Sequence, residues 1–365
     1  ALIVHEVQRN LEILRTETQD VPPRHRSMAT VFEQSWRLLS NGERSTLRQL
    51  AIFVGTFDYA AAQAVTGATL PQLATLIDKS WIAATPTGRL YLHELVRQFT
   101  QEKLVGEHQL ATGETEAAVQ RRHSQWYGEL LHRMEPLLQG QDQVTALQQI
   151  RAERTNIWAA WQWAVTQHAV PFFQAAAFPL WYAADTLGWF PEAIDAYTAA
   201  INALRAKMVG MQVGMPKAGE APGLAMSLIL AELLTYQAIL YPRCGQLAQA
   251  QQNCTEALVH LQTLSTTPQQ QFGMALAQMI HGWVLHDLAE DEAAVTALAA
   301  ARAILDGPQH RWWLGQAELL LGLAVHSLGR HDEAKAHFMA AAQIWQALGE
   351  QRFRCFALGR LAELA

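Results

Sequence analysis

Residues 331–342 read HDEAKAHFMAAA, and residues 291–302 read DEAAVTALAAAR. Each stretch has an alanine at its fourth position, a large apolar residue four positions later and another alanine three positions after that. Positions spaced by three and four residues lie on one face of an α-helix. The pattern therefore predicts two helices that bury the same narrow face.

The same spacing recurs through the second half of the chain. Its first alanines are Ala193, Ala250, Ala294 and Ala334. Small residues that would let a preceding helix approach closely stand before the last three of them, at Ala238, Gly282 and Gly322. A turn sequence lies between each of these small residues and the alanine that follows it. Residues 172–365 are therefore predicted to form an α-solenoid of tetratricopeptide-like hairpins, packed at Ala250, Gly282, Ala294, Gly322 and Ala334.

One segment interrupts this pattern. Residues 208–223, MVGMQVGMPKAGEAPG, are rich in glycine and proline, which predicts a flexible loop. The hairpins on either side can bury their apolar faces only by stacking on one another, and a stack leaves a concave surface that can hold a partner. We therefore expect this half of the chain to be a scaffold or sensor.

The first half is built differently. Residues 28–106 predict short helices followed by a β-hairpin around Thr85-Pro86-Thr87-Gly88, which is the order of a winged-helix domain. The third of these helices, residues 70–80, contains no arginine to read bases, so a structural or docking role is favoured over DNA binding. Residues 1–27 are interpreted as the end of a helical domain and a linker. Residues 107–171 are interpreted as a helical linker or first repeat, with long helices at 116–138 and 144–167.

Bulk properties exclude several classes of partner. The chain has 365 residues, a net charge of -6 and no run of Lys or Arg, which argues against direct nucleic-acid binding. No stretch is long and apolar enough to predict a membrane span. The three cysteines, Cys244, Cys254 and Cys355, form no CxxC pair, which favours free thiols and a cytoplasmic location. The chain is therefore expected to act in the cytoplasm on proteins, peptides or small molecules.

Common catalytic motifs are missing from the sequence. It contains no GxxxxGK[ST] phosphate loop, no GxGxxG, no HExxH and no GxSxG. Its fourteen histidines show no zinc-ligand spacing, so no metal site is predicted. We expect no enzyme activity. The alternative left open is an unrecognised active site among His310, Trp312, Trp313 and Glu318.

Several segments of the first half together resemble a known family. They are RHRS at 24–27, FEQSW at 32–36, LAIFVGTF at 50–57 and LHELVRQF at 92–99. These resemble the region after the nucleotide-binding domain in STAND-type (NB-ARC-like) signalling ATPases. In that family a Met-His-Asp triplet of the winged helix brings its histidine to the β-phosphate of ADP. Leu92-His93-Glu94 is similar to this triplet, which implies nucleotide sensing by His93 with Leu92 and Glu94 as neighbours.

This resemblance implies a fragment of a switch. ADP or ATP with Mg²⁺ would be bound by a nucleotide-binding domain expected upstream of Ala1, and this chain by itself would hold no cofactor. The winged helix would restrain the ADP-bound resting state. The repeats would bind a protein, peptide or small-molecule inducer, with transcriptional control as one output. The alternative is a constitutive scaffold for protein–protein interaction that does not switch.

Overall fold

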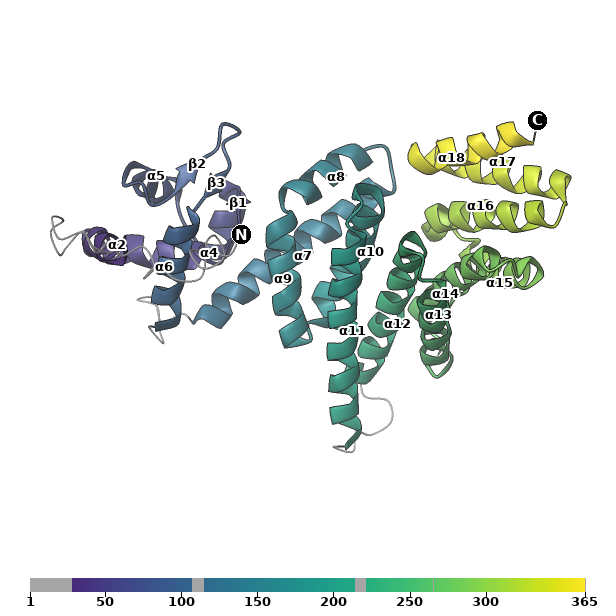
Figure 1. Ribbon diagram of the computed structural model, residues 1–365, viewed down its shortest axis with the longest axis horizontal. Helices are drawn as coiled ribbons and strands as arrows, with labels where there is room; N and C mark the ends of the chain where they lie inside the picture. Colours follow the sequence, from purple (N-terminus) through teal and green to yellow (C-terminus); the bar gives the residue numbers. More distant parts are fainter. Residues whose placement is uncertain (1–27, 107–114, 214–220, 265, 365) are drawn as a thin grey trace. The chain divides into compact units, whose positions relative to one another are not determined.

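The computed structural model describes residues 28–106, 115–213, 221–264 and 266–364, and the prediction of a mainly α-helical chain with an array of helical hairpins is confirmed (Figure 1). Contacts divide the chain into two units. The first unit comprises residues 1–128 with 152–163, and the second comprises 129–151 with 164–365. The segment expected to end a helical domain, residues 1–27, lies outside the described residues.

The first unit contains short helices and a small sheet. Its elements are α2 (Met28–Arg37), α3 (Asn41–Leu50), β1 (Thr56–Phe57), α4 (Tyr59–Thr66), α5 (Leu70–Asp78), β2 (Ala83–Ala84), β3 (Leu90–Tyr91) and α6 (Glu94–Gly106). The predicted hairpin is confirmed, because β2 pairs antiparallel with β3. β1 adds to the other edge of β3, which gives the strand order β1-β3-β2.

Side-chain caps set where these helices begin. Asp58 caps α4, and its carboxylate accepts a hydrogen bond from the backbone N–H of Ala61 at 2.7 Å. Asn41 is the first residue of α3 and does not cap it. Ser40 is the cap, because its hydroxyl accepts from the backbone of Glu43 at 3.2 Å while the Glu43 carboxylate accepts from the backbone of Ser40 at 2.6 Å. This reciprocal pair satisfies two N–H groups at once.

Three helices connect the hairpin region to the repeats. They are α7 (Glu116–Leu138), α8 (Gln143–Ala152) and α9 (Arg154–Gln167). The single helix expected over residues 144–167 is therefore wrong, since a turn at Glu153 divides it. That turn lets the buried Glu153 carboxylate accept from the Tyr127 hydroxyl at 3.0 Å and pair with Arg89 at 2.6 Å.

The second unit is the array of helical hairpins. Its elements are α10 (Val170–Leu187), α11 (Phe190–Val213), α12 (Ala221–Leu240), η3 (Tyr241–Cys244), α13 (Leu247–Gln262), α14 (Pro268–Asp287), α15 (Asp291–Leu305), η4 (Pro308–His310), α16 (Arg311–Ser327), α17 (His331–Leu348) and α18 (Arg352–Glu363). Figure 1 shows α10, α12, α14 and α16 following one another along the array. Gly188, Gly245, Gly329 and Gly349 reverse the chain with positive φ, and Ala289 does so at φ 61°.

The repeated small residues lie where helices meet. Ala193, Ala250, Ala294 and Ala334 are each fully buried. A Cβ added to Gly282 would lie 2.6 Å from the side chain of Leu298 in α15. A Cβ added to Gly322 would meet the ring of Phe338 in α17. Only glycine therefore lets α14 and α16 approach their partner helices this closely.

The predicted loop at 208–223 is wrong at both ends. Residues 208–213 complete α11 and residues 221–223 begin α12, while 214–220 lie outside the described residues.

Among the described helices, the segment Gly223–Cys244 is long and apolar enough to cross a membrane, with a mean hydropathy of 1.6. In the array 67% of that window is buried, because α12 packs against neighbouring helices on several sides. Its apolar sequence is accounted for by this packing.

Candidate functional site

Aromatic side chains fill the inner side of the repeat array. They come from helices far apart in the sequence, and their ring centroids lie between 4.7 and 6.1 Å from one another in successive contacts. The members are Phe178, Trp181, Tyr182, Tyr236, Trp312, Trp313 and Phe353. Offset and edge-to-face pairs of this kind add to the free energy gained by burying the rings. The cluster joins α10, α12, α16 and α18.

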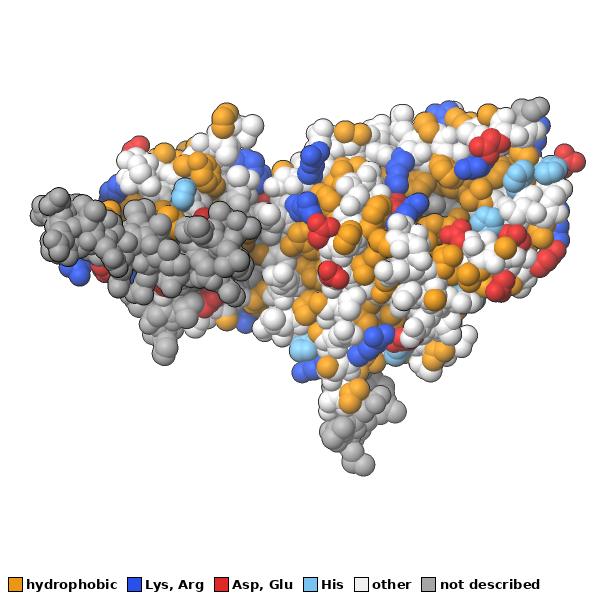
Figure 2. Space-filling view, in the orientation of Figure 1, with side chains coloured by type: hydrophobic (Ala, Val, Ile, Leu, Met, Phe, Trp, Pro, Cys, Tyr) orange, Lys and Arg blue, Asp and Glu red, His pale blue; other side chains and the backbone are white. Residues whose placement is uncertain are grey.

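A pocket opens beside this cluster, with a volume of about 370 Å³. Its walls are supplied by the inner helices α10, α12, α14 and α16, by the η3 turn and by α18. Trp283, Trp313 and Phe356 are its aromatic walls, and Leu320 and Leu323 line it from α16. Figure 2 shows hydrophobic side chains gathered over this array, with Lys and Arg side chains among them. This volume lies within the range of small-molecule sites.

An acid held between two arginines stands at one side of the pocket. The Asp185 side chain is only 3% exposed, and its two oxygens accept from Arg243 Nε at 3.0 Å and from Arg352 Nη2 at 2.6 Å. The guanidinium of Arg243 lies 5.6 Å from the centroid of Trp283. The Arg352 guanidinium lies 4.8 Å from the centroid of Phe353. Salt bridges and cation–π contacts therefore fix both arginines in place.

Two buried donors of the pocket lack acceptors. Trp181 and Gln316 both line it and are 4% and 8% exposed. Trp181 Nε1 and Gln316 Nε2 are buried and make no hydrogen bond within the described part of the chain. Most buried polar atoms in proteins have a partner, so each orphaned atom calls for an explanation. Both atoms are donors, and both belong to side chains that line the pocket.

The second acid of the pocket is also engaged. Asp287 forms a side-chain hydrogen bond with Trp283, and burial raises the pKa of its carboxyl against the opposing effects of His286 and Arg243. Raising the pKa of a carboxyl weakens its tendency to carry negative charge. Both carboxyl groups of the pocket therefore have partners within the protein.

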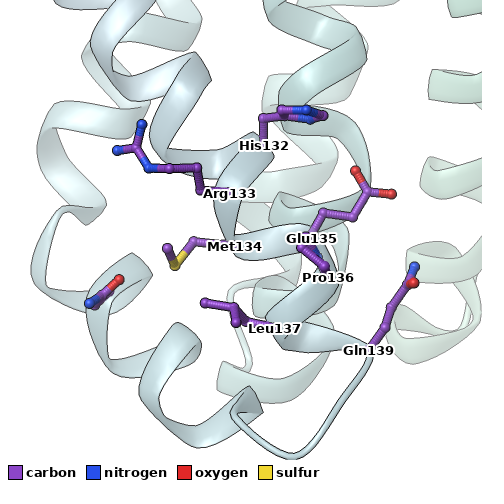
Figure 3. A pocket seen from close by; sticks show the side chains of 8 residues that line it. His132, Arg133, Met134, Glu135, Pro136, Leu137 and Gln139 are labelled. Atoms are coloured by element: carbon purple, nitrogen blue, oxygen red, sulfur yellow. The ribbon is translucent and has the colours of Figure 1, made fainter. Parts of the chain in front are cut away.

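A second candidate is a shallow, largely open surface along the end of α7. Figure 3 shows that His132 and Glu135 point to one side of the helix, whereas Arg133, Met134 and Leu137 point to the other. Burial raises the pKa of Glu135. The labelled side chains do not converge on a common point, so this surface is a weaker candidate than the pocket of the array.

The triplet predicted from sequence lies at the start of α6. Leu92 is buried in the first unit, whereas His93 is exposed immediately before the helix. The His93 Nδ1 atom accepts from the backbone N–H of Leu95 at 3.4 Å. Glu94 pairs with Arg97 at 2.8 Å, and that hydrogen bond holds the pKa of its carboxyl below the usual value. The histidine is thus accessible, and its role in nucleotide sensing stays a prediction.

The residues named for the alternative enzyme do not form one site. Trp313 lines the pocket, but Glu318 is buried away from it and bonds Arg302 Nε at 2.5 Å and His337 Nδ1 at 2.6 Å. His310 stacks on Phe272 with centroids 4.6 Å apart. Over the described ranges, no group of three or more His, Cys, Asp or Glu side chains could hold a metal ion.

Sequence reasoning did not identify the polar residues of the pocket. Asp185 and Arg352 lie 167 residues apart and meet only because α18 packs back toward α10. No periodicity marks either one. The only available signal was local: Arg243 follows a proline in a turn, and Arg352 stands in the first turn of a helix, where a positive charge is disfavoured by the helix dipole.

Comparisons with known proteins give partial likenesses. No model of a protein family matches the chain. Over 190 residues the chain is 29% identical to proteins of Mycobacterium bovis and Mycobacterium tuberculosis named "Putative HTH-type transcriptional regulator", and the match covers 47% of this chain and 20% of each relative. The chain therefore spans about a fifth of the length of the curated relatives it matches.

Two solved structures are also similar. One is a Signal Transduction ATPase with Numerous Domains (STAND) protein with a tetratricopeptide repeat sensor from Pyrococcus horikoshii, with a TM-score of 0.31, 13% identity and coverage of 98% of this chain and 57% of that one. The other is the apo form of RapI, with a TM-score of 0.41, 14% identity and coverage of 74% of this chain and 65% of that one.

Proposed function

We propose that this chain is the regulatory and sensor portion of a bacterial STAND-type signalling ATPase. In this proposal the repeat array binds an inducer in the pocket lined by α10, α12, α14, α16 and α18. The observation that carries the sensor role is the pocket itself, where aromatic walls stand beside two buried donors that have no acceptor among the described residues. The likeness to proteins named as transcriptional regulators supports a role in regulation.

Filling the pocket should abolish inducer binding. Leu323 lines the pocket and is partly exposed, so Leu323→Trp would occupy the cavity without rebuilding the core. A ligand present at about 100 times its Kd stabilises a folded protein by about 2.7 kcal/mol. For a unit of this size we expect a low-molecular-weight cell extract to raise the Tm of the unsubstituted chain by about 5 °C. The Leu323→Trp variant should show no such rise.

The matched control for this experiment is Met339→Trp. Met339 is 45% exposed on α17 and does not line the pocket, so its variant should respond to the extract as the unsubstituted chain does. A Tm rise of equal size in Leu323→Trp would place the binding elsewhere. The absence of any rise with extracts from cells grown under many conditions would count against a small-molecule sensor.

The nucleotide latch is the second part of the proposal. We propose that the first unit acts as a winged helix and that His93 donates a hydrogen bond to the β-phosphate of ADP held by an upstream domain. Its exposure at the start of α6 leaves the ring available for such a contact. An imidazole is a suitable group for a switch, because its donor can be withdrawn when domains separate.

His93→Ala in the longer protein that carries a nucleotide-binding domain should weaken ADP retention by roughly tenfold, the loss of one charge-assisted hydrogen bond. Nucleotide content after gel filtration would measure this. Leu323→Trp in the same protein is the control, since it should leave ADP retention intact. Unchanged retention in His93→Ala would favour the second candidate, a constitutive tetratricopeptide scaffold that holds a protein partner without switching.

A further inference from the structure

Several hydrogen-bond donors of the pocket are left unused. Trp181 Nε1 and Gln316 Nε2 have no acceptor within the described residues. Arg243 uses its Nε atom to bond Asp185, and the hydrogen bonds found for it in the described part of the chain leave both Nη atoms available. A guanidinium carries five N–H donors. The pocket therefore offers several donors to whatever binds in it.

The two carboxylates of the pocket already have partners. Both oxygens of Asp185 are bound by arginines, and Asp287 bonds Trp283. To bind Asp185, a cationic ligand would have to displace Arg243 or Arg352 from a carboxylate that is 3% exposed. Leaving a buried charge without its partner costs several kcal/mol. An anion would meet no such obstacle.

The arginines are held ready for an anion. Arg243 is 44% exposed and Arg352 is 32% exposed, so each can reach a ligand without being extracted from the core. Asp185 and the aromatic rings already restrict their side-chain rotamers. Binding therefore loses little additional side-chain entropy, which favours affinity. Arginine also matches the geometry of a carboxylate with paired N–H groups.

The remaining walls require an apolar body. Trp283, Trp313 and Phe356 contribute rings, and Phe356 is 48% exposed, which is high for a phenylalanine. Covering such a surface removes apolar area from water. A volume of about 370 Å³ is near the lower end for ligand pockets, so it suits a small molecule or the last residues of a peptide.

From these observations, and resting on the proposed sensor function, we infer that the pocket binds a ligand with a ring-bearing apolar body and one carboxylate. The carboxylate lies against Arg243 and Arg352. The body lies along Trp283 and Phe356, beside the side chains of Trp181 and Gln316. A free aromatic acid and the C-terminal residue of a peptide share this chemistry.

Isothermal titration calorimetry with four probes tests the inference. The first pair is 2-naphthylacetate and its neutral amide, and the second is a tetrapeptide that ends in phenylalanine, as the free acid and as the C-terminal amide. We expect at least one acid to bind about tenfold more tightly than the corresponding amide, a difference of about 1.4 kcal/mol. Preference within the first pair alone identifies a free acid as the source, and preference within the second pair alone identifies a peptide terminus.

Arg243→Gln should reduce the preference for the acid over its amide about tenfold and leave binding of the amide unchanged. The matched control is Arg330→Gln, since Arg330 is similarly exposed but pairs with Glu292 outside the pocket. Equal affinity for acid and amide in the unsubstituted chain would overturn the inference, and so would an unchanged preference for the acid in Arg243→Gln. A Tm rise with cell extract that Leu323→Trp abolishes would still support the sensor in that case, so the two failures can be told apart.

Discussion

Gly322→Val is expected to destabilise the repeat array by about 3 kcal/mol, the cost of forcing extra carbon atoms into a packed core. A Cβ at this position would meet the ring of Phe338, which is 1% exposed and cannot move aside. The variant must push α16 away from α17 or drive the ring into a strained rotamer. Urea unfolding followed by circular dichroism would measure the loss.

Gly359→Val is the matched control for this variant. Gly359 also lies inside a helix, α18, but a Cβ there would have no atom within 4 Å. Valine has a slightly better helix propensity than glycine, so stability should change by less than about 0.5 kcal/mol. Combining Gly322→Val with Phe338→Leu should recover part of the loss. Equal stability of the Gly322 and Gly359 variants would mean that close contact between α16 and α17 does not hold the array together.

Glu350→Ala is expected to cost about 3 kcal/mol, because several hydrogen bonds to a buried carboxylate are lost together. Glu350 is 0% exposed, and its oxygens accept from the backbone N–H of Phe353 at 2.8 Å and from Gln143 Nε2 at 3.1 Å. They also accept from the backbone of Arg352 and Arg354. The carboxylate thus caps the start of α18 and ties that helix to α8.

Glu333→Ala provides the comparison, since Glu333 is exposed near the start of α17 and its loss should change stability by less than about 0.5 kcal/mol.

The loss of stability in Glu350→Ala has a functional consequence. Arg352, Phe353 and Phe356 reach the pocket from α18, so loosening this helix should also weaken ligand binding. A variant that unfolds at the same urea concentration as the unsubstituted chain would show that the buried carboxylate contributes nothing net. Burial does raise its pKa, so part of the gain from the hydrogen bonds is offset.

The two variants, Gly322→Val and Glu350→Ala, perturb different helices of the pocket. Gly322 sets how closely the outer helix α17 approaches α16, which carries Leu320 and Leu323 into the pocket. Glu350 fixes the helix that closes the pocket on its other side. Packing between repeats and the shape of the binding site are therefore coupled, because helices that pack on one another also line the pocket. Ligand binding should in turn stabilise the array.

The sequence by itself determined the helices of the repeat array. Ala294, Leu298 and Ala301 recur at helical spacing, and all three are fully buried. Local chemistry also determined where several helices begin or end: Asp58 caps α4, and glycines reverse the chain after other helices. The prediction of a continuous helix failed at Glu153, where contacts from Arg89 and Tyr127 favour a turn inside a sequence that is otherwise helical. Such contacts come from distant segments and leave no local trace.

Only the tertiary structure decided where the candidate site lies. Small differences in the angle between successive hairpins accumulate along a solenoid, and they bring α18 back against α10. This return unites Asp185 with Arg352 and closes a pocket around Trp283 and Trp313. Periodicity reports which face of a helix is buried, but it does not report which distant helix will cover that face. The repeats were therefore readable from sequence, and their binding site became visible only in three dimensions.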